Sequence, residues 1–177
     1  MQPSANLYLI GPMGVGKSTI GRMLAAALDR PFFDSDREIE AVTGADIPWI
    51  FDVEGEAGFR VREERMIDTL TQRDGIVMAT GGGAILSANS RANLKSRGTV
   101  VYLKASIAQQ FERTSKDRNR PLLQTADPLS RIRELMNIRE PLYNETAHIM
   151  VDTSRRGPRT VVTEILRRLR EYEQPAT

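Results

Sequence analysis

The sequence predicts an α/β fold in which a parallel β-sheet is covered by helices on both faces. Segments typical of strands and of helices alternate along the chain, as they do where crossover helices join parallel strands. The strand segments are apolar throughout, which indicates burial on both faces of the sheet. A length of 177 residues suits one domain with a substantial core.

The first half of the chain contains three apolar segments that predict strands. These are Asn6 to Ile10, "PFFDSD" up to Asp34, and "GIVMATGGG". After the first strand, apolar residues recur at helical spacing up to Asp29. "REIEAVTG" predicts a helix that ends at Gly44, and a long charged helix is expected over residues 56–73.

The second half predicts two more strands, "TVVYLKA" and "AHIMVD", and helices over residues 128–144 and 159–172. Between them, residues 113–125 are polar and basic, are interrupted by Pro121, and follow neither period. Connections of this length inside a compact domain are usually functional lids or disordered. We therefore expect one domain with five strands, in which residues 113–125 form either a functional lid or a disordered segment.

The composition excludes several classes of protein. The net charge is only +2, so nothing calls for nucleic acid or an acidic membrane surface, and no apolar stretch is long enough to span a bilayer. The chain has no cysteine, which fits a reducing cytosol, and a cytoplasmic protein is expected. Of its 25 basic residues 21 are arginine, which suits an anionic substrate or reflects a general compositional bias.

Two conspicuous single residues are expected to be structural. His148 is the one histidine in the sequence and enters a predicted buried strand, and a histidine alone does not make a metal site. Trp49 is expected to pack between a helix and the core. Neither residue is predicted to take part in chemistry.

The stretch "GPMGVGKST", residues 11–19, fits the motif G-x-x-x-x-G-K-[ST] between a predicted strand and a predicted helix. Its glycines let backbone N–H groups turn inward around anionic oxygens, and the helix that follows adds the positive end of its dipole. Lys17 can reach the β- and γ-phosphates, and the Ser18 hydroxyl can bind Mg²⁺. The motif predicts ATP or GTP binding.

The second substrate has to be inferred from other residues. Asp34 and Asp36 lie at the carboxyl end of the second strand, where ligands bind in open parallel sheets. One carboxylate could face a metal and the other a substrate hydroxyl. Alternatively, Ser35 or Asp36 could simply cap the next helix. The residues alone leave both possibilities open.

"TGGG" ends the third strand, and its glycines would let a ligand approach the backbone closely or would only form a flexible turn. Arg60 and Arg139 could each be an ordinary exposed helix arginine. Arg120 precedes Pro121 in the basic segment, where it could close over a phosphate.

Taken together, "GPMGVGKST", "FFDSD", "GEAGFRVRE", "ATGGGAI", "RNRPLL" and "REPLY" resemble the shikimate kinase family in order and spacing. They extend from residue 11 to 143. The resemblance implies a three-layer P-loop kinase fold of the nucleoside-monophosphate-kinase type. It also implies a five-stranded parallel sheet, a substrate-binding segment over about 34–62 and a mobile lid over about 113–125. The implied reaction is transfer of the γ-phosphoryl group of ATP to the 3-hydroxyl of shikimate.

The resemblance also implies a role for each motif residue. Shikimate would be held by Asp36, Arg60 and Arg139 and lined by Gly81, Gly82 and Gly83, with Asp36 accepting the proton of the attacking hydroxyl. Lys17 and Arg120 would stabilise the migrating phosphoryl group. Mg²⁺ would bind Ser18 and Asp34, and a monomer is expected. The nucleotide would contact Gly11, Gly14, Val15, Gly16, Lys17, Ser18, Thr19, Arg113, Arg120 and Arg156.

Two other functions fit part of the pattern. A kinase for gluconate or for a nucleoside monophosphate shares the fold and the first motif, but Arg60, Arg139 and "TGGG" favour shikimate. A GTP-dependent switch is suggested by "DVEG" at residues 52–55, which matches D-x-x-G. The sequence has no N-K-x-D guanine motif, however, and this argues against a switch.

Overall fold

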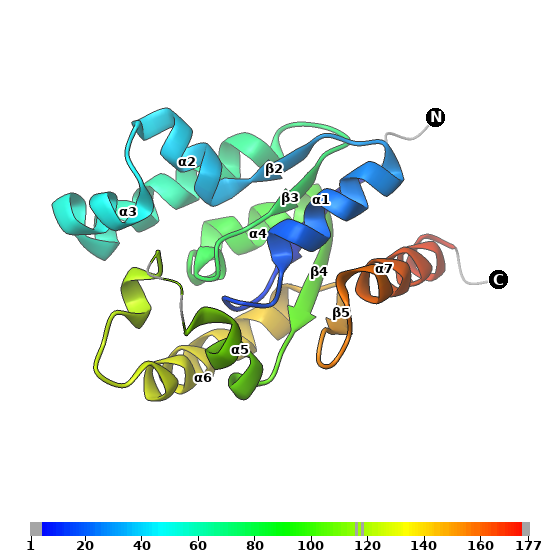
Figure 1. The fold of residues 1–177 in the computed structure, drawn as a ribbon. Helices are drawn as coiled ribbons and strands as arrows, with labels where there is room; N and C mark the ends of the chain where they lie inside the picture. Colours follow the sequence, from blue (N-terminus) through cyan, green and yellow to red (C-terminus); the bar gives the residue numbers. More distant parts are fainter. Residues whose placement is uncertain (1–4, 116, 118, 175–177) are drawn as a thin grey trace.

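The computed structural model describes residues 5–115, 117 and 119–174, and within them a five-stranded parallel sheet with helices on both faces (Figure 1). The strand order is β2-β3-β1-β4-β5, and every pairing is parallel. The strands are β1 (Asn6–Ile10), β2 (Phe32–Asp34), β3 (Val77–Ala79), β4 (Gly98–Lys104) and β5 (Ile149–Asp152). The predicted fold class is confirmed.

Seven α-helices and two short 3-10 turns connect these strands in the described part of the chain. The α-helices are α1 (Lys17–Leu28), α2 (Ser35–Thr43), α3 (Ile47–Thr71), α4 (Ala88–Arg97), α5 (Ile107–Thr114), α6 (Pro128–Thr146) and α7 (Pro158–Glu173). The turns are η1 (Ala84–Leu86) and η2 (Pro121–Leu123).

The core lies in two layers, one on each face of the sheet. On one face, α1 and α7 pack on Leu7 and Leu9 of β1. On the other face, α3, α4 and α6 pack on Tyr8 and Ile10. Successive residues of β1 therefore point into different layers, and both layers are apolar. This is why the strands are apolar runs in the sequence.

Helix α3 begins earlier than predicted. Asp46 caps it, since its side chain accepts a hydrogen bond from the Trp49 N–H, and Pro48 occupies the first turn, where its missing N–H costs nothing. The expected start at residue 56 coincides with a break inside α3, because Gly55 has φ 72° and ψ 176°. By contrast, the predicted helix end at Gly44 is confirmed, with Gly44 in the left-handed conformation.

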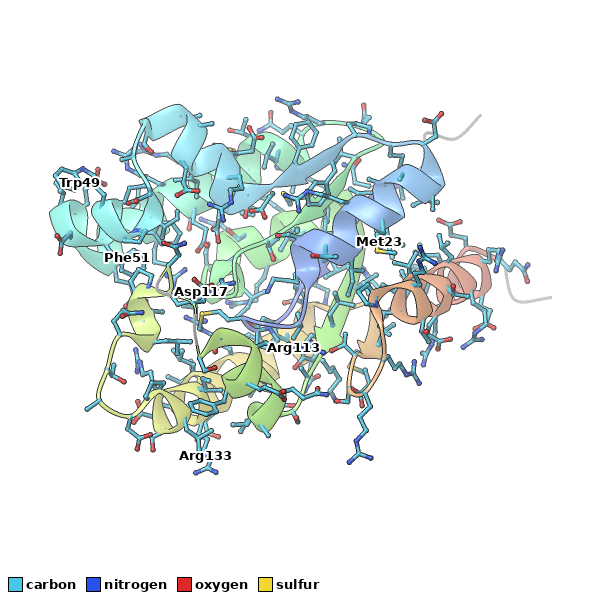
Figure 2. All side chains as sticks on the ribbon, in the orientation of Figure 1. Met23, Trp49, Phe51, Arg113, Asp117 and Arg133 are labelled. Atoms are coloured by element: carbon cyan, nitrogen blue, oxygen red, sulfur yellow. The ribbon has the colours of Figure 1, made fainter. Side chains whose placement is uncertain are left out.

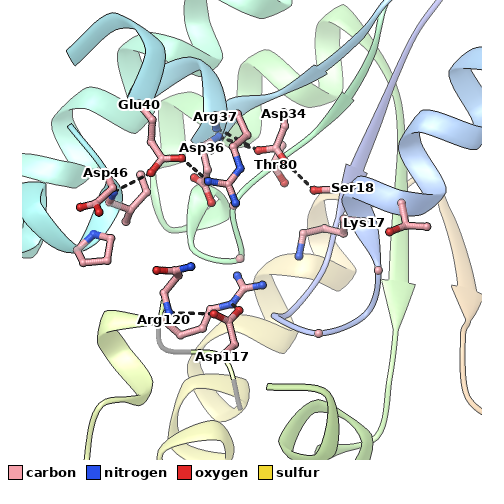
Figure 3. A pocket seen from close by; sticks show the side chains of 18 residues that line it. Lys17, Ser18, Asp34, Asp36, Arg37, Glu40, Asp46, Thr80, Asp117 and Arg120 are labelled. Atoms are coloured by element: carbon pink, nitrogen blue, oxygen red, sulfur yellow. Dashed lines mark hydrogen bonds and ion pairs between the residues drawn. The ribbon is translucent and has the colours of Figure 1, made fainter. Parts of the chain in front are cut away.

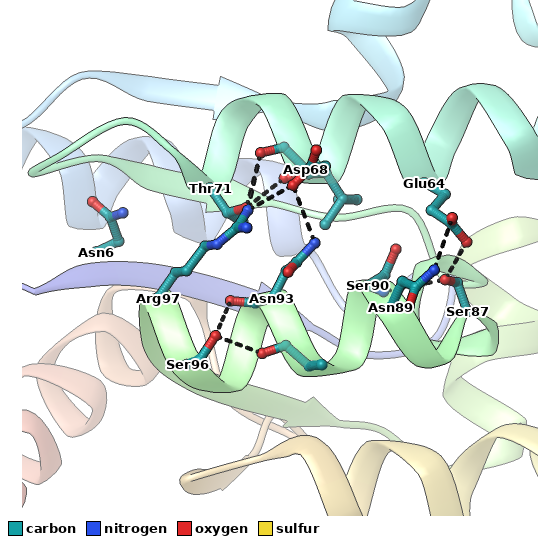
Figure 4. A network of polar contacts seen from close by, with 12 residues as sticks. Asn6, Glu64, Asp68, Thr71, Ser87, Asn89, Ser90, Asn93, Ser96 and Arg97 are labelled. Carbon is teal, nitrogen blue, oxygen red and sulfur yellow. Dashed lines mark hydrogen bonds and ion pairs between the residues drawn. The ribbon is translucent and has the colours of Figure 1, made fainter.

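Two helices, α4 and α5, were not predicted. Only Ser90 and Leu94 of α4 are buried, so α4 has no apolar stripe. It is held instead by polar contacts with α3, in which Ser87 donates to Glu64 and Arg97 donates to Asp68 (Figure 4). Helix α5 buries the polar residues Gln110 and Thr114 and is only eight residues long, too short for a clear apolar period in the sequence.

The structure contradicts the expectation for Trp49 but gives His148 a structural contact. Trp49 is 61% exposed and lies on the outside of α3 (Figure 2), so the expectation that it packs on the core is wrong. The side chain of His148 does have a structural contact, because its Nδ1 accepts a hydrogen bond from the Val100 N–H at 2.9 Å. The imidazole thereby continues the pairing of β4 with the segment before β5.

This contact predicts a loss of stability in acid. Nδ1 accepts only when unprotonated, and burial together with Lys95 lowers the pKa of His148. The stabilisation is complete above the unfolded pKa of about 6.5 and decreases as the pH falls toward the lower folded pKa. We expect urea unfolding between pH 7.5 and 5.5 to show this loss. In His148→Gln the corresponding part of the pH dependence should disappear. An unchanged pH dependence would contradict the prediction.

Among the residues that the structure describes, no helix is long and apolar enough to cross a bilayer.

Candidate functional site

The phosphate-binding motif forms the turn between β1 and α1, as predicted. Gly16 caps α1 with φ 89° and ψ 26°, a left-handed conformation that glycine adopts without strain. In the described part of the chain no side chain caps this helix, so the N–H groups of its first turn are available to an anion.

Lys17 is already directed along this turn. Its Nζ donates hydrogen bonds to the carbonyl oxygens of Gly11 and Pro12, at 2.7 and 2.8 Å. Loss of hydration and the positive charge of Arg120 lower the pKa of Lys17 to about 7. A bound phosphate would supply the opposite charge and restore the ammonium form.

Ser18 and Asp34 form the part of the site that could hold a metal. The Ser18 hydroxyl donates to Asp34 Oδ2 at 2.5 Å, while Asp34 Oδ1 accepts from the N–H groups of Asp36 and Arg37. Asp34 therefore caps α2, and the alternative that Ser35 or Asp36 is the cap is wrong. Hydroxyl and carboxylate oxygens fit Mg²⁺, which usually takes few protein ligands beside phosphates and water. The described residues contain no cluster of three or more acidic, histidine or cysteine side chains that could hold a metal without a nucleotide.

A cavity of about 500 Å³ lies in front of the motif (Figure 3). Its walls come from α1, α2, the start of α3, the glycine loop 80–82 and the segment before η2. Lys17, Asp34, Asp36 and Arg120 all line it. The fold thus brings together predicted site residues that are more than 100 positions apart in the sequence.

Asp36 lies where this cavity joins a smaller one, because it lines both. Among the described residues its Oδ1 is buried without a hydrogen-bond partner. Burial first, and then the negative charges of Glu63 and Asp34, raise the pKa of Asp36 to about 7. The carboxyl group is therefore poised to exchange a proton near neutral pH.

The smaller cavity, about 60 Å³, contains the two predicted substrate arginines and the loop Gly81–Gly83. Arg139 is only 3% exposed, and its Nε and Nη2 find no partner among the residues described. The Nε of Arg60 is likewise buried and unpaired there. Buried guanidinium donors without partners are costly, so they mark a place for an anionic ligand.

The glycine loop allows the approach of Arg60. A Cβ atom built on Gly83 would come within 2.4 Å of the Arg60 guanidinium. A side chain at position 83 would therefore displace the end of this arginine.

Glu63 belongs to this cavity and was not predicted. It accepts a hydrogen bond from Arg60 Nη1 at 2.7 Å, and burial raises its pKa although Arg60 opposes the rise. Within the described chain its Oε2 is buried and unpaired. One signal could have revealed it: a charged residue four positions after Phe59 falls in the apolar stripe of the helix.

Arg120 lines both cavities and is held by Asp117, whose Oδ2 accepts from Arg120 Nε at 2.9 Å. The expected segment 113–125 contains helical structure at two places, since α5 extends to Thr114 and η2 covers Pro121–Leu123. The expectation that this segment lacks helical structure is wrong at those positions. Lys116 and Arg118 lie outside the described residues.

A third cavity of about 300 Å³ lies on the other side of the phosphate motif. Gly14 and Thr19 line it together with Arg113 and Arg156, so the structure brings these predicted residues together. Arg113 also donates to the carbonyl oxygen of Gly14 at 3.0 Å. The "DVEG" stretch, in contrast, lies inside α3 and not in a loop that follows a strand, as a switch would require.

Known proteins resemble this chain over nearly its whole length. The family model for shikimate kinase matches residues 13–170. The shikimate kinase of Chromohalobacter salexigens is 57% identical over 99% of this chain and 97% of its own length. That of Pseudomonas syringae pv. tomato is 60% identical over 94% of this chain and 96% of its own. Among solved structures, the shikimate kinase of Acinetobacter baumannii in complex with shikimate has a TM-score of 0.95 at 49% identity, covering 97% of this chain and 96% of that one.

Proposed function

The chain belongs to the shikimate kinase family, and we propose that its joined cavities divide the family reaction between ATP and shikimate. The enzyme transfers the γ-phosphoryl group of ATP to the 3-hydroxyl of shikimate, giving shikimate 3-phosphate and ADP. One observation supports this division of the site: Arg60 and Arg139 have buried donors that find no partner among the described residues, and they line the same cavity as Asp36, whose pKa is raised.

In this proposal, Arg60 and Arg139 bind the carboxylate of shikimate. Arginine presents paired N–H donors that match a carboxylate, whereas lysine would act only as a point charge. The backbone of Gly81–Gly83 lines the ring, and Glu63 holds Arg60 in place.

Asp36 orients the 3-hydroxyl and accepts its proton. The hydroxyl oxygen forms a bond with the γ-phosphorus, and the bond to the β–γ bridging oxygen breaks. Its electron pair leaves with ADP, and the hydroxyl proton goes to the Asp36 carboxylate. A pKa near 7 allows the carboxyl group to take up and release this proton at neutral pH.

The phosphate motif and two cations stabilise the transferring group. Backbone N–H groups at the start of α1 surround the phosphates, and Lys17 and Arg120 approach them from different elements. Ser18 and Asp34 would hold Mg²⁺, which would neutralise phosphate charge when bound. Alignment and charge stabilisation carry most of the rate acceleration.

The nucleotide base binds in the third cavity, between Arg113 and the Arg156–Pro158 stretch. The guanidinium of Arg113 can stack on adenine from α5. Residues 34–62 form the substrate-binding segment and residues 113–125 the lid of a single domain covering residues 1–177. A monomeric state and a cytoplasmic location stay predictions, and sedimentation at working concentration tests the first.

A substrate panel tests the proposed function. Purified protein is assayed for ADP release with ATP, Mg²⁺ and either shikimate, gluconate or a nucleoside monophosphate, and phosphorus NMR identifies the product. We expect ester formation with shikimate and a rate at least about 100-fold lower with the others, since they leave the buried polar groups unpaired. Equal rates with gluconate would overturn the assignment of Arg60 and Arg139.

A further inference from the structure

Beneath the glycine loop lies a buried tyrosine that the proposed chemistry does not use. The hydroxyl of Tyr143 donates a hydrogen bond to the Gly82 carbonyl oxygen at 2.5 Å. The side chain is fully buried, and its ring stacks on Tyr102 of β4 with the centroids 4.9 Å apart. The ring is therefore fixed by the core while its hydroxyl faces the site.

Tyr143 and Arg139 share one helix. They are four residues apart on α6, so both project from the same face about one turn apart. Arg139 also approaches Gly82, because a Cβ atom built there would lie 3.5 Å from Arg139 Nη1. The glycine loop therefore contacts two residues of α6. Tyr143 donates a hydrogen bond to it, and the cation of Arg139 lies next to it.

We propose that Tyr143 is a positioning residue for the shikimate site: its hydroxyl anchors the Gly82 carbonyl and so sets the spacing between the glycine loop and Arg139. The inference rests on the proposed function, since it assumes that the loop and Arg139 contact the same ligand. Tyr143 lies behind the loop and is not a catalytic residue.

The chemistry of the contact supports this role. Burial raises the pKa of Tyr143, so its hydroxyl keeps the proton and remains a donor at any physiological pH. Without that donor the Gly82 carbonyl would lose a buried partner, and the loop could shift toward another one. Shikimate would then have to order the loop as it binds, and its affinity would fall.

The decisive variant is Tyr143→Phe, which deletes one oxygen atom and keeps the ring. Tyr102→Phe is the matched control, because its ring belongs to the same stack and is equally buried. Within the described chain, no hydrogen bond links the Tyr102 hydroxyl to the glycine loop. Both variants are assayed for KM and kcat with each substrate, for shikimate binding by calorimetry, and for thermal unfolding.

We expect Tyr143→Phe to weaken shikimate binding and raise its KM by about 10-fold, with the KM for ATP within about twofold of wild type. Tyr102→Phe should leave both KM values within about twofold. Equal effects of the two variants on shikimate binding would overturn the inference, as would parallel rises in both KM values. Failure of the wild-type enzyme to phosphorylate shikimate would instead refute the proposed function, so the two failures are distinguishable.

Discussion

Asp36→Asn is expected to lower kcat by at least about 100-fold, the usual scale for loss of a general base. The amide keeps the shape of the side chain but cannot take up the hydroxyl proton. Because Lys17 and the turn before α1 are unchanged, the affinity for ATP should stay within about threefold. Stopped-flow ADP release and nucleotide binding by calorimetry measure the two quantities separately.

Two pH measurements sharpen this prediction. The pKa of Asp36 is about 7 in the folded protein and about 3.9 in the unfolded chain. Acid should therefore lower kcat/KM for shikimate below about pH 7 in the wild type, and this limb should vanish in Asp36→Asn. A near-normal rate in the variant would reduce Asp36 to a binding residue.

The raised pKa of Asp36 also affects the stability of the fold, but in the opposite direction: low pH lowers the activity and favours folding. A carboxyl group whose folded pKa is raised favours folding at low pH and opposes it as the pH rises from its unfolded pKa through its folded pKa. At pH 8 the buried charge of Asp36, next to Glu63, is unfavourable. Asp36→Asn should therefore unfold at a higher temperature than wild type at pH 8. A loss of activity together with a loss of stability would indicate a misfolded variant.

Arg120→Ala is expected to lower kcat by at least about 100-fold, the cost of removing one donor to the charge of a transition state. The KM for shikimate should change by less than about threefold, because Arg60 and Arg139 hold the carboxylate. Arg120 reaches the cavity from the segment before η2, where Asp117 accepts a hydrogen bond from it.

Arg133→Ala provides the control for net charge. Arg133 is exposed on α6 and points away from the cavities (Figure 2), so its removal should leave kcat within about twofold. Arg120→Lys should restore only part of the rate, since lysine keeps the charge but not the planar donors. Unchanged turnover in Arg120→Ala would contradict both the lid assignment and the role of this arginine.

The sequence alone was sufficient to predict those features that depend on residues close together in the chain. The phosphate motif, the helix end at Gly44 and the five apolar strands each depend on spacing or on backbone conformation within a short stretch. Parallel pairing then places the carboxyl ends of the strands at one edge, so a site near Asp34 and the glycine loop could be expected from the order of elements alone.

Prediction from the sequence failed where packing is polar. Helix α4 buries only Ser90 and Leu94, so apolar periodicity did not detect it, and α5 is only eight residues long. Asp34 and not Ser35 or Asp36 caps α2, a choice that depends on backbone angles at the end of β2. The pattern of apolar residues in the sequence also could not show that Trp49 faces outward on the kinked helix α3.

By itself, the sequence determined that this chain forms a parallel sheet with a phosphate-binding turn, because those features arise from residues close together in the chain. Tertiary structure alone decided that Glu63 braces Arg60, that Tyr143 anchors Gly82, and that Asp36 has a pKa near 7. These properties depend on burial and on charges contributed by separate elements, and no spacing within one segment encodes such proximity.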